Sequence, residues 1–246
     1  MLQFSTSYQS TVQHSSHSLS VVPISQLSIT KMSLKPITLY GCGLGPNPWK
    51  AVMVFEQLGL PYENKVLAFE DMKKEPFESI NPNGRVPAIE DPNTGITIWE
   101  SGAILEYLVE TYDKERTISF EPGSKDYFLA KQWLHFQVSG QGPYFGQAVW
   151  FTKFHPEKIE SAKERYYNEI RRVSSVLDRV LKDKEYLAGD KWSYADLAFI
   201  PWYLLVDMLG ISLSEYPHLE AWLNRQKAKP AVAKALEARA AIIASQ

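Results

Sequence analysis

The spacing of apolar residues changes near residue 113, and this change limits the folds that the chain can adopt. From Pro36 to Tyr112, short apolar runs alternate with turns and helical segments, whereas after residue 123 the apolar residues recur every three or four positions. This division is typical of an α/β domain followed by an all-helical domain. With 246 residues, the chain has room for two small domains, each with its own core.

The first half is predicted to have the element order βαβ, a link, and then ββα. We expect strands at residues 37–40 and 62–67 with a helix over 49–58 between them, then a hairpin of residues 86–89 and 96–99, and a helix over 100–112. No strand is expected after residue 123. Helices are expected over 129–140, 159–180, 193–208, 217–227 and 230–243. Glycines 140, 142 and 146 are expected to break or kink the first of these helices at its end.

Four segments follow from these patterns. Residues 1–31 contain no Asp, Glu or Arg and are dense in Ser, Thr and Gln, so we expect a disordered N-terminal extension over 1–33. A mitochondrial presequence would also be poor in acids, but it would contain Arg, and a start at Met32 is a further alternative. An α/β domain at 34–113, a linker at 114–123 and a helical domain at 124–246 complete the predicted organisation.

Composition excludes several function classes. The net charge of −2 argues against nucleic acid as a partner. The longest apolar run, Leu197–Val206, is too short to span a bilayer, so no membrane partner is expected. A single cysteine allows no internal disulfide and fits a reducing compartment such as the cytoplasm. The five His residues have no metal-ligand spacing, and we predict no metal site.

The turn over residues 41–48 is the first candidate for chemistry. Its glycines have the spacing G-x-G-x-G, and Glu63 lies where a ribose-binding acid would be expected. Pro46 and Pro48, however, remove N–H groups that a dinucleotide pyrophosphate would need. Dinucleotide binding is therefore disfavoured.

Two interpretations of Asn47-Pro48 remain open from the residues alone. Asn and Pro are preferred residues for the N-cap and the first position of a helix, which would explain the pair. Alternatively, the Asn47 amide donates to an anion such as a thiolate. Cys42 precedes the helix start, so it is interpreted as a small strand-end residue more readily than as a nucleophile.

Two further motifs suggest contacts to an extended peptide. A cis bond at Val86-Pro87 would turn the Val86 backbone outward, where it could pair with a peptide as a strand does. Glu100-Ser101 at a helix start is either a capping arrangement or an anion clamp that holds a carboxylate.

Three motifs in order resemble those of the soluble glutathione transferases, from about Pro36 to the C-terminus. They are the segment from Asn81 to Ile89 with its expected cis-Pro87, the acid-Ser motif Ile98–Ile104, and Ser193-Tyr194-Ala195-Asp196, which is similar to the family's N-capping box. The resemblance implies a thioredoxin-like N-terminal domain and a helical C-terminal domain. Gly45–Lys50 resembles the branch of fungal nitrogen-regulator-like transferases and bacterial disulfide reductases.

The resemblance also implies roles for residues. Asn47 contacts the thiol of glutathione, in preference to Tyr40, while Val86, Glu100 and Ser101 bind the peptide, and Arg85 with Lys73 or Lys74 reaches the glycyl carboxylate. Tyr144, Phe145 and Trp150 are candidates for the electrophile pocket, with core packing as the alternative. Pro87, Ser193 and Asp196 are structural.

The function that follows is conjugation of glutathione, a cosubstrate, to a small hydrophobic electrophile, in a protein expected to be a cytoplasmic homodimer that serves detoxification. Reduction of disulfides or peroxides by glutathione at the same site is one alternative. A non-enzymatic regulator or binding module with the same fold is the other.

Overall fold

The computed structural model describes residues 34–41 and 43–245 of the chain. The predicted disordered extension, 1–33, and Cys42 lie outside these residues. Within them, a four-stranded sheet has the order β2-β1-β3-β4, formed by β1 (Ile37–Gly41), β2 (Tyr62–Val66), β3 (Ala88–Asp91) and β4 (Ile96–Trp99). β1 is parallel to β2 and antiparallel to β3, and β3 and β4 form the predicted antiparallel hairpin. The βαβ-ββα arrangement expected from the sequence is confirmed.

The first helix of this half is longer than predicted, whereas the helix after the hairpin begins one residue later than predicted. α1 (Pro46–Leu58) begins three residues before the predicted start at Trp49, because the proline at its first position carries no N–H that a helix would need to satisfy. Gly59 ends it with φ of 63°, a left-handed conformation that glycine adopts readily. The link contains a short 3-10 turn, η2 (Phe69–Asp71), and α2 (Phe77–Ile80), and α3 (Ser101–Tyr112) follows β4.

The described residues after 123 form helices joined by loops and contain no strand, as predicted. The elements are α4 (Lys125–Phe136), η3 (Gln137–Gln141), α5 (Gly142–Val149), η4 (Trp150–Phe154), α6 (Glu160–Leu181), α7 (Tyr194–Tyr203), η5 (Asp207–Leu209), α8 (Pro217–Lys227) and α9 (Pro230–Ala244). The prediction that one helix runs over 193–208 is wrong at its end. Pro201 lies inside α7, which stops two residues later, and the chain then forms the 3-10 turn η5.

The glycines at 140, 142 and 146 do not break the helix between α4 and α5. The chain instead stays helical through η3, a π-helical segment, and a second π-helical segment, η4, follows α5. π-Helical turns are rare and occur often at functional sites because they rotate side chains out of the regular register. Gln137 and Gln141, at the two ends of η3, are both fully buried.

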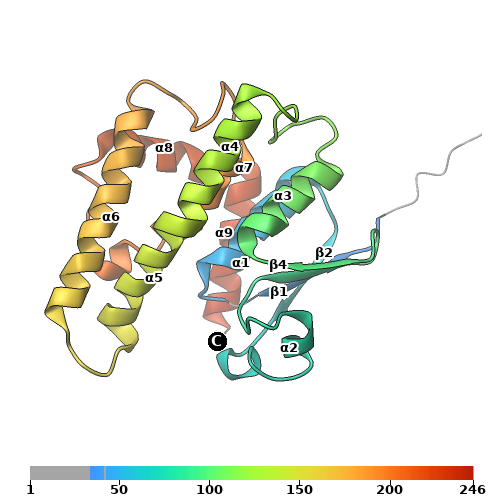
Figure 1. Cartoon of the computed structure of the whole chain (residues 1–246), viewed down its shortest axis with the longest axis horizontal. Helices are drawn as coiled ribbons and strands as arrows, with labels where there is room; N and C mark the ends of the chain where they lie inside the picture. Colours follow the sequence, from blue (N-terminus) through green and yellow to red (C-terminus); the bar gives the residue numbers. More distant parts are fainter. Residues whose placement is uncertain (1–33, 42, 246) are drawn as a thin grey trace, which may run out of the picture. The chain divides into compact units, whose positions relative to one another are not determined.

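α1 lies at the centre of this fold. It packs against α3, α7 and α9, and in Figure 1 it lies with α7 and α9 between the strands and the helices α4, α5 and α6. Its residues 48–55 are all buried. The N-terminus of α1 is therefore fixed from both halves of the molecule.

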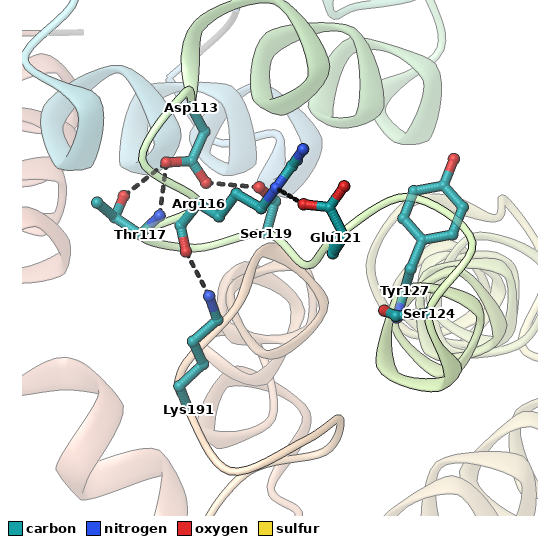
Figure 2. A network of polar contacts seen from close by, with 8 residues as sticks. All are labelled: Asp113, Arg116, Thr117, Ser119, Glu121, Ser124, Tyr127 and Lys191. Carbon is teal, nitrogen blue, oxygen red and sulfur yellow. Dashed lines mark hydrogen bonds and ion pairs between the residues drawn. The ribbon is translucent and has the colours of Figure 1, made fainter.

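The segment that joins the two halves is held by one carboxylate. Asp113 accepts hydrogen bonds from Thr117 N (2.7 Å) and Oγ1 (2.8 Å), Ile118 N (2.9 Å) and Ser119 Oγ (2.7 Å), several of which Figure 2 shows. Lys191 donates to the carbonyl oxygen of Arg116 from the loop before α7. The Asp113 contacts hold the segment against the end of α3, and the Lys191 contact ties it to the helical half.

The predicted N-capping box of α7 is confirmed. Ser193 N and Oγ both donate to Asp196 Oδ2, over 3.1 and 3.0 Å, and Leu187 N donates to the other carboxylate oxygen over 2.9 Å. Both members of the box are fully buried. The box therefore fixes the start of the central helix and also the loop before it.

Candidate functional site

Sheet register gathers the candidate segments at one end of the sheet. Ala88 of β3 is paired with Tyr40 of β1 on one side and with Trp99 of β4 on the other. The end of β1, the residues that precede β3 and the residues that follow β4 therefore lie next to one another. Val86 precedes β3, Glu100 and Ser101 follow β4, and α1, which carries Asn47, begins five residues after the end of β1.

One interpretation of the sequence made Asn47 the N-cap of α1, and the structure shows that this interpretation is wrong. The N-cap is Gly45, which offers no side-chain cap, and Asn47 is the second residue of the helix. Trp49 closes the preceding turn by donating from Nε1 to Gly43 O over 3.1 Å. The Asn47 side chain is therefore released from capping and is available for another role.

That side chain is oriented by the helical half. Trp202 of α7 donates from Nε1 to Asn47 Oδ1 over 2.9 Å. An indole nitrogen can only donate, so the amide atom that it contacts must be the oxygen. Both N–H groups of Asn47 Nδ2 consequently remain for other acceptors. Gly146 of α5 makes room for the Trp202 ring, since a Cβ there would lie 3.3 Å from it.

Val86 precedes a cis bond to Pro87, as predicted. Asn81 shapes the approach to it by donating from Nδ2 to Arg85 O over 2.5 Å and accepting from Asn83 N over 3.0 Å. A Cβ on Gly84 would meet Lys73 Cγ at 2.9 Å, so the Lys73 stem lies against this turn. The structure thus brings Lys73 and Arg85 to the same loop region, with both side chains exposed.

Glu100 and Ser101 lie where β4 passes into α3. Glu100 is exposed and has φ of 73° and ψ of 117°, in a region that residues other than glycine seldom adopt. Backbone strain of this kind persists where the surroundings fix it, and it gathers at ligand sites. Ser101, the first residue of α3, is 5% exposed.

Lys50 belongs to this site, although the sequence analysis assigned it no role. Its side chain is 1% exposed, and Nζ donates to Ser101 Oγ over 3.1 Å and to Gln137 Oε1 over 2.5 Å. Burial lowers the pKa of Lys50 to about 7, and the charge of Glu100 opposes that shift. The sequence signal was a lysine inside the apolar run of α1, three residues after Asn47 and so on the same helix face.

Tyr40 is engaged elsewhere. Its hydroxyl donates to Glu90 Oε2 over 2.6 Å. Burial, together with that hydrogen bond and the charge of Glu90, raises the pKa of Tyr40 to about 12. The phenol is therefore a neutral donor already committed to a carboxylate.

Phe145, one of the three residues expected in an electrophile pocket, is a core residue. It is fully buried and packs edge-on against Trp202 and Tyr203, 6.5 and 5.3 Å between ring centroids. Tyr144 is partly buried beneath the Arg172 guanidinium, and Trp150 is 45% exposed in η4 beside Phe154. Only these two retain surface that could meet a ligand.

Across residues 34–41 and 43–245, no group of three or more His, Cys, Asp or Glu side chains could hold a metal ion. None of the described helices combines the length and apolarity that crossing a bilayer would require.

Both halves of the chain match models of known protein families. Residues 35–110 match the family model "Glutathione S-transferase, N-terminal domain", and residues 143–230 match "Glutathione S-transferase, C-terminal domain". The chain is 48% identical over 216 residues to the glutathione S-transferase-like protein tpcF of Aspergillus fumigatus, covering 82% of this chain and 96% of that one.

Two other similar proteins bear on function. The chain is 36% identical over 241 residues to the transcriptional regulator URE2 of Saccharomyces cerevisiae, covering 82% of this chain and 68% of that one. The crystal structure of the glutathione transferase URE2P6 from Phanerochaete chrysosporium, in complex with oxidised glutathione, superimposes with a TM-score of 0.82 at 45% identity and covers 85% of this chain and 98% of that one.

Proposed function

The chain belongs to the glutathione S-transferase family, and from that premise we propose that it conjugates the thiolate of glutathione to a small hydrophobic electrophile. In this reaction the sulfur forms a bond to an electrophilic carbon, and a leaving group departs or a double bond takes up the electron pair. The observation that carries the proposal is the orientation of the Asn47 amide by Trp202, because among the described residues it leaves both N–H groups of Asn47 Nδ2 available at the start of α1.

Asn47 is the proposed thiolate contact. The thiol of glutathione has a pKa near that of cysteine, about 8.5, so little thiolate exists at neutral pH. Hydrogen bonds from Asn47 Nδ2 stabilise the anion, and each unit by which the thiol pKa falls corresponds to about 1.4 kcal/mol. An amide cannot accept the thiol proton, so this assistance is electrostatic rather than general-base catalysis.

The helix start adds a second contribution. The first N–H groups of a helix have no partner within it, but Pro46 and Pro48 have no N–H to offer. The backbone N–H of Asn47 therefore stands between two prolines as a donor at the positive end of α1. The side chain and the backbone of one residue together form the proposed anion site.

The peptide part of glutathione is proposed to bind along the end of the sheet. Val86 pairs with the cysteinyl backbone, Glu100 binds the γ-glutamyl ammonium, and Ser101 binds the carboxylate of the same residue. Arg85 and Lys73 are the candidates for the glycyl carboxylate, supported by the contact of the Lys73 stem with the loop that carries Arg85. Tyr144 and Trp150 remain candidates for the electrophile side.

Reduction of disulfides by glutathione is the second candidate function. It is favoured by the neighbouring transferase structure that contains oxidised glutathione, the product of such a reaction. A regulatory role is a third, since one relative is named a transcriptional regulator. We further propose a cytoplasmic homodimer with the domain boundaries given from the sequence, in line with the family's usual organisation.

Activity with two substrates tests this proposal. We expect the full-length protein to conjugate glutathione to a chloro-dinitrobenzene faster than it reduces a mixed disulfide of glutathione. Asn47→Ala should lower turnover on the order of tenfold to a thousandfold, because the side-chain amide donor group is lost while the helix end stays. Cys42→Ser is the control and should retain activity. An essential Cys42 with a dispensable Asn47 would mean a mixed-disulfide mechanism, and the reductase function would replace conjugation.

A further inference from the structure

A chain of buried polar side chains runs from the start of α3 into the core of the helical half. Lys50 Nζ donates to Ser101 Oγ and to Gln137 Oε1. Gln137 Nε2 donates to Gln141 Oε1 over 3.0 Å, and Gln141 Nε2 donates to Phe199 O over 3.2 Å. Gln137 and Gln141 are the two end residues of the π-helical segment η3.

The direction of every bond in this chain is fixed. An ammonium group can only donate and a carbonyl oxygen can only accept, so the two amides between them must align head to tail. Gln137 therefore presents its oxygen to Lys50 and cannot flip. Lys50 in turn is held with its nitrogen 3.1 Å from Ser101 Oγ.

This arrangement determines what the Ser101 hydroxyl can do. A serine hydroxyl has one proton and two acceptor sites. Because Lys50 occupies one acceptor site from the buried side, the hydroxyl proton is left for a second acceptor. Ser101 is thereby presented as a donor at the first turn of α3, where backbone N–H groups also favour an anion.

Lys50 has no ion-pair partner among the described residues, although the charge of Glu100 favours its ammonium form. A buried ammonium without a counter-ion is costly, and an acceptor that brings negative charge to Ser101 would relieve that cost.

We propose that Lys50 is a positioning residue for the amino-acid end of the peptide ligand, which turns the Ser101 hydroxyl toward the ligand's α-carboxylate and supplies the buried positive charge that this carboxylate meets. The inference rests on the proposed function, since it takes Ser101 as the carboxylate contact. A carboxylate oxygen that accepts from Ser101 would lie within about 6 Å of Nζ, by adding one ordinary hydrogen bond to the observed one.

Proton uptake on binding is the consequence that separates this role from a structural one. With a pKa of about 7, Lys50 of the free protein loses its charge as the pH rises above neutrality. A bound carboxylate favours the ammonium form, so binding takes up a proton and affinity falls with rising pH, at most about tenfold per pH unit.

The groups around Lys50 support this assignment. Glu100 favours the charged form, while Ser101 and Gln137 are neutral. The elements that pack against α1 bring ionisable groups that have partners of their own. α9 supplies Lys234, which is paired with Glu56, and α7 supplies Asp196, which is bound in the capping box.

Calorimetric binding of S-hexylglutathione to the full chain tests the proposal. This probe is suited to it because its sulfur carries no proton. Between pH 6 and pH 8.5 we expect the wild-type affinity to fall on the order of tenfold or more. Lys50→Met should bind the probe on the order of tenfold to a hundredfold more weakly at pH 6. Its affinity should fall less between pH 6 and pH 8.5, because only the amino group of the ligand still loses a proton. Lys191→Met, which removes a lysine that ties the linker, should keep the wild-type profile.

A second variant decides the matter if Lys50→Met does not fold. Gln137→Glu places a carboxylate beside Lys50 and raises its pKa, so the fall in affinity should move to higher pH. An unmoved profile in this variant, or wild-type affinity and profile in Lys50→Met, would overturn the inference and leave the proposed function intact. Failure of the wild type to bind the probe at any pH would overturn both.

Discussion

Trp202 and Asn47, which lie 155 positions apart in the sequence, share a hydrogen bond of 2.9 Å from the indole Nε1 to the amide Oδ1. The bond joins the core helix of the helical half to the first helix of the α/β half. The direction in which the Asn47 N–H groups point therefore depends on the helical half, although the proposed anion site lies in the α/β half.

Loss of this bond should lower activity without removing the donor. We expect Trp202→Phe to reduce turnover with a chloro-dinitrobenzene by about threefold to thirtyfold, because the amide can then flip and present its oxygen to the thiolate. The affinity for S-hexylglutathione should change less. Trp192→Phe is a matched control, since the described residues place no acceptor beside Trp192 Nε1. Equal effects in the two variants would show that only ring packing matters.

Glu100 combines a ligand role with a strained backbone, and one substitution should separate the two. In Glu100→Gly the positive φ carries no steric cost, so we expect the free energy of unfolding to stay the same or to rise by about 1 kcal/mol. Glutathione affinity should fall about tenfold or more with loss of the carboxylate. Urea unfolding and calorimetry measure the two effects.

Arg116→Gly is the control for the Glu100 variant. Arg116 also has a positive φ, of 51°, but lies in the linker, so its substitution should leave affinity unchanged. A Glu100→Gly protein that binds normally would remove Glu100 from the proposed site.

Asp113 should control stability through the linker. Burial alone would raise the pKa of Asp113, but hydrogen bonds from Ile118, Ser119 and Thr117 hold it below its ordinary value. We expect Asp113→Ala to lower the free energy of unfolding by on the order of 2–3 kcal/mol, because buried donors lose a charged acceptor. Glu121→Ala, which breaks an exposed ion pair with Arg116, should cost less than about 1 kcal/mol.

The same carboxylate gives stability a pH dependence of definite sign. A depressed pKa in the folded state means that the unfolded chain binds more protons, so the contribution of Asp113 is present above the ordinary pKa near 3.8 and is lost as the pH falls through the folded value. Asp113→Asn should therefore show a shallower loss of stability below pH 4 than the wild type. Parallel acid-unfolding curves would contradict this.

Asp196 should act on stability alone. Asp196→Ala removes the acceptor of Ser193 and Leu187 at the start of α7, and loss of a cap costs about 0.5–2 kcal/mol. The midpoint of thermal unfolding should drop while turnover at low temperature is retained. Ser124→Ala, which removes the N-cap of the more exposed start of α4, provides a comparison for an ordinary cap. An unchanged midpoint for Asp196→Ala would count against the capping box.

Local signals predicted much of the fold. The turn of the β3–β4 hairpin, the prolines at the starts of α8 and α9, and the Ser193–Asp196 box all act over a few residues. The second hairpin strand, the two helix starts and the box were predicted correctly, whereas the first hairpin strand begins at Ala88, two residues later than predicted. The order of the motifs along the sequence was then enough to predict an α/β half followed by a helical half. The start of α1 was wrong because three favourable first residues, Pro46, Asn47 and Pro48, compete within one turn.

The site was less accessible to prediction because its key contacts join distant segments. The apolar residues around Lys50 indicate that it lies in a buried stretch, but nothing near it in the sequence indicates Gln137 as its partner, and nothing near Asn47 indicates Trp202. Phe145 was a candidate for the electrophile pocket with core packing as the alternative, and aromatic character alone could not separate the two. Its burial depends on Trp202 and Tyr203, which come from a helix fifty or more residues further along.

The buried series of hydrogen bonds from Lys50 to Phe199 limits how this protein can be recombined with its relatives. A chimaera that takes residues 34–113 from one parent and the helical half from another inherits Lys50 without a guarantee of Gln137. If an apolar residue stands at position 137, the hybrid protein buries the Lys50 ammonium with one hydrogen-bond partner fewer and should express poorly. Exchange of halves would therefore succeed only between parents that carry both ends of the contact, so that these two positions are inherited as one unit.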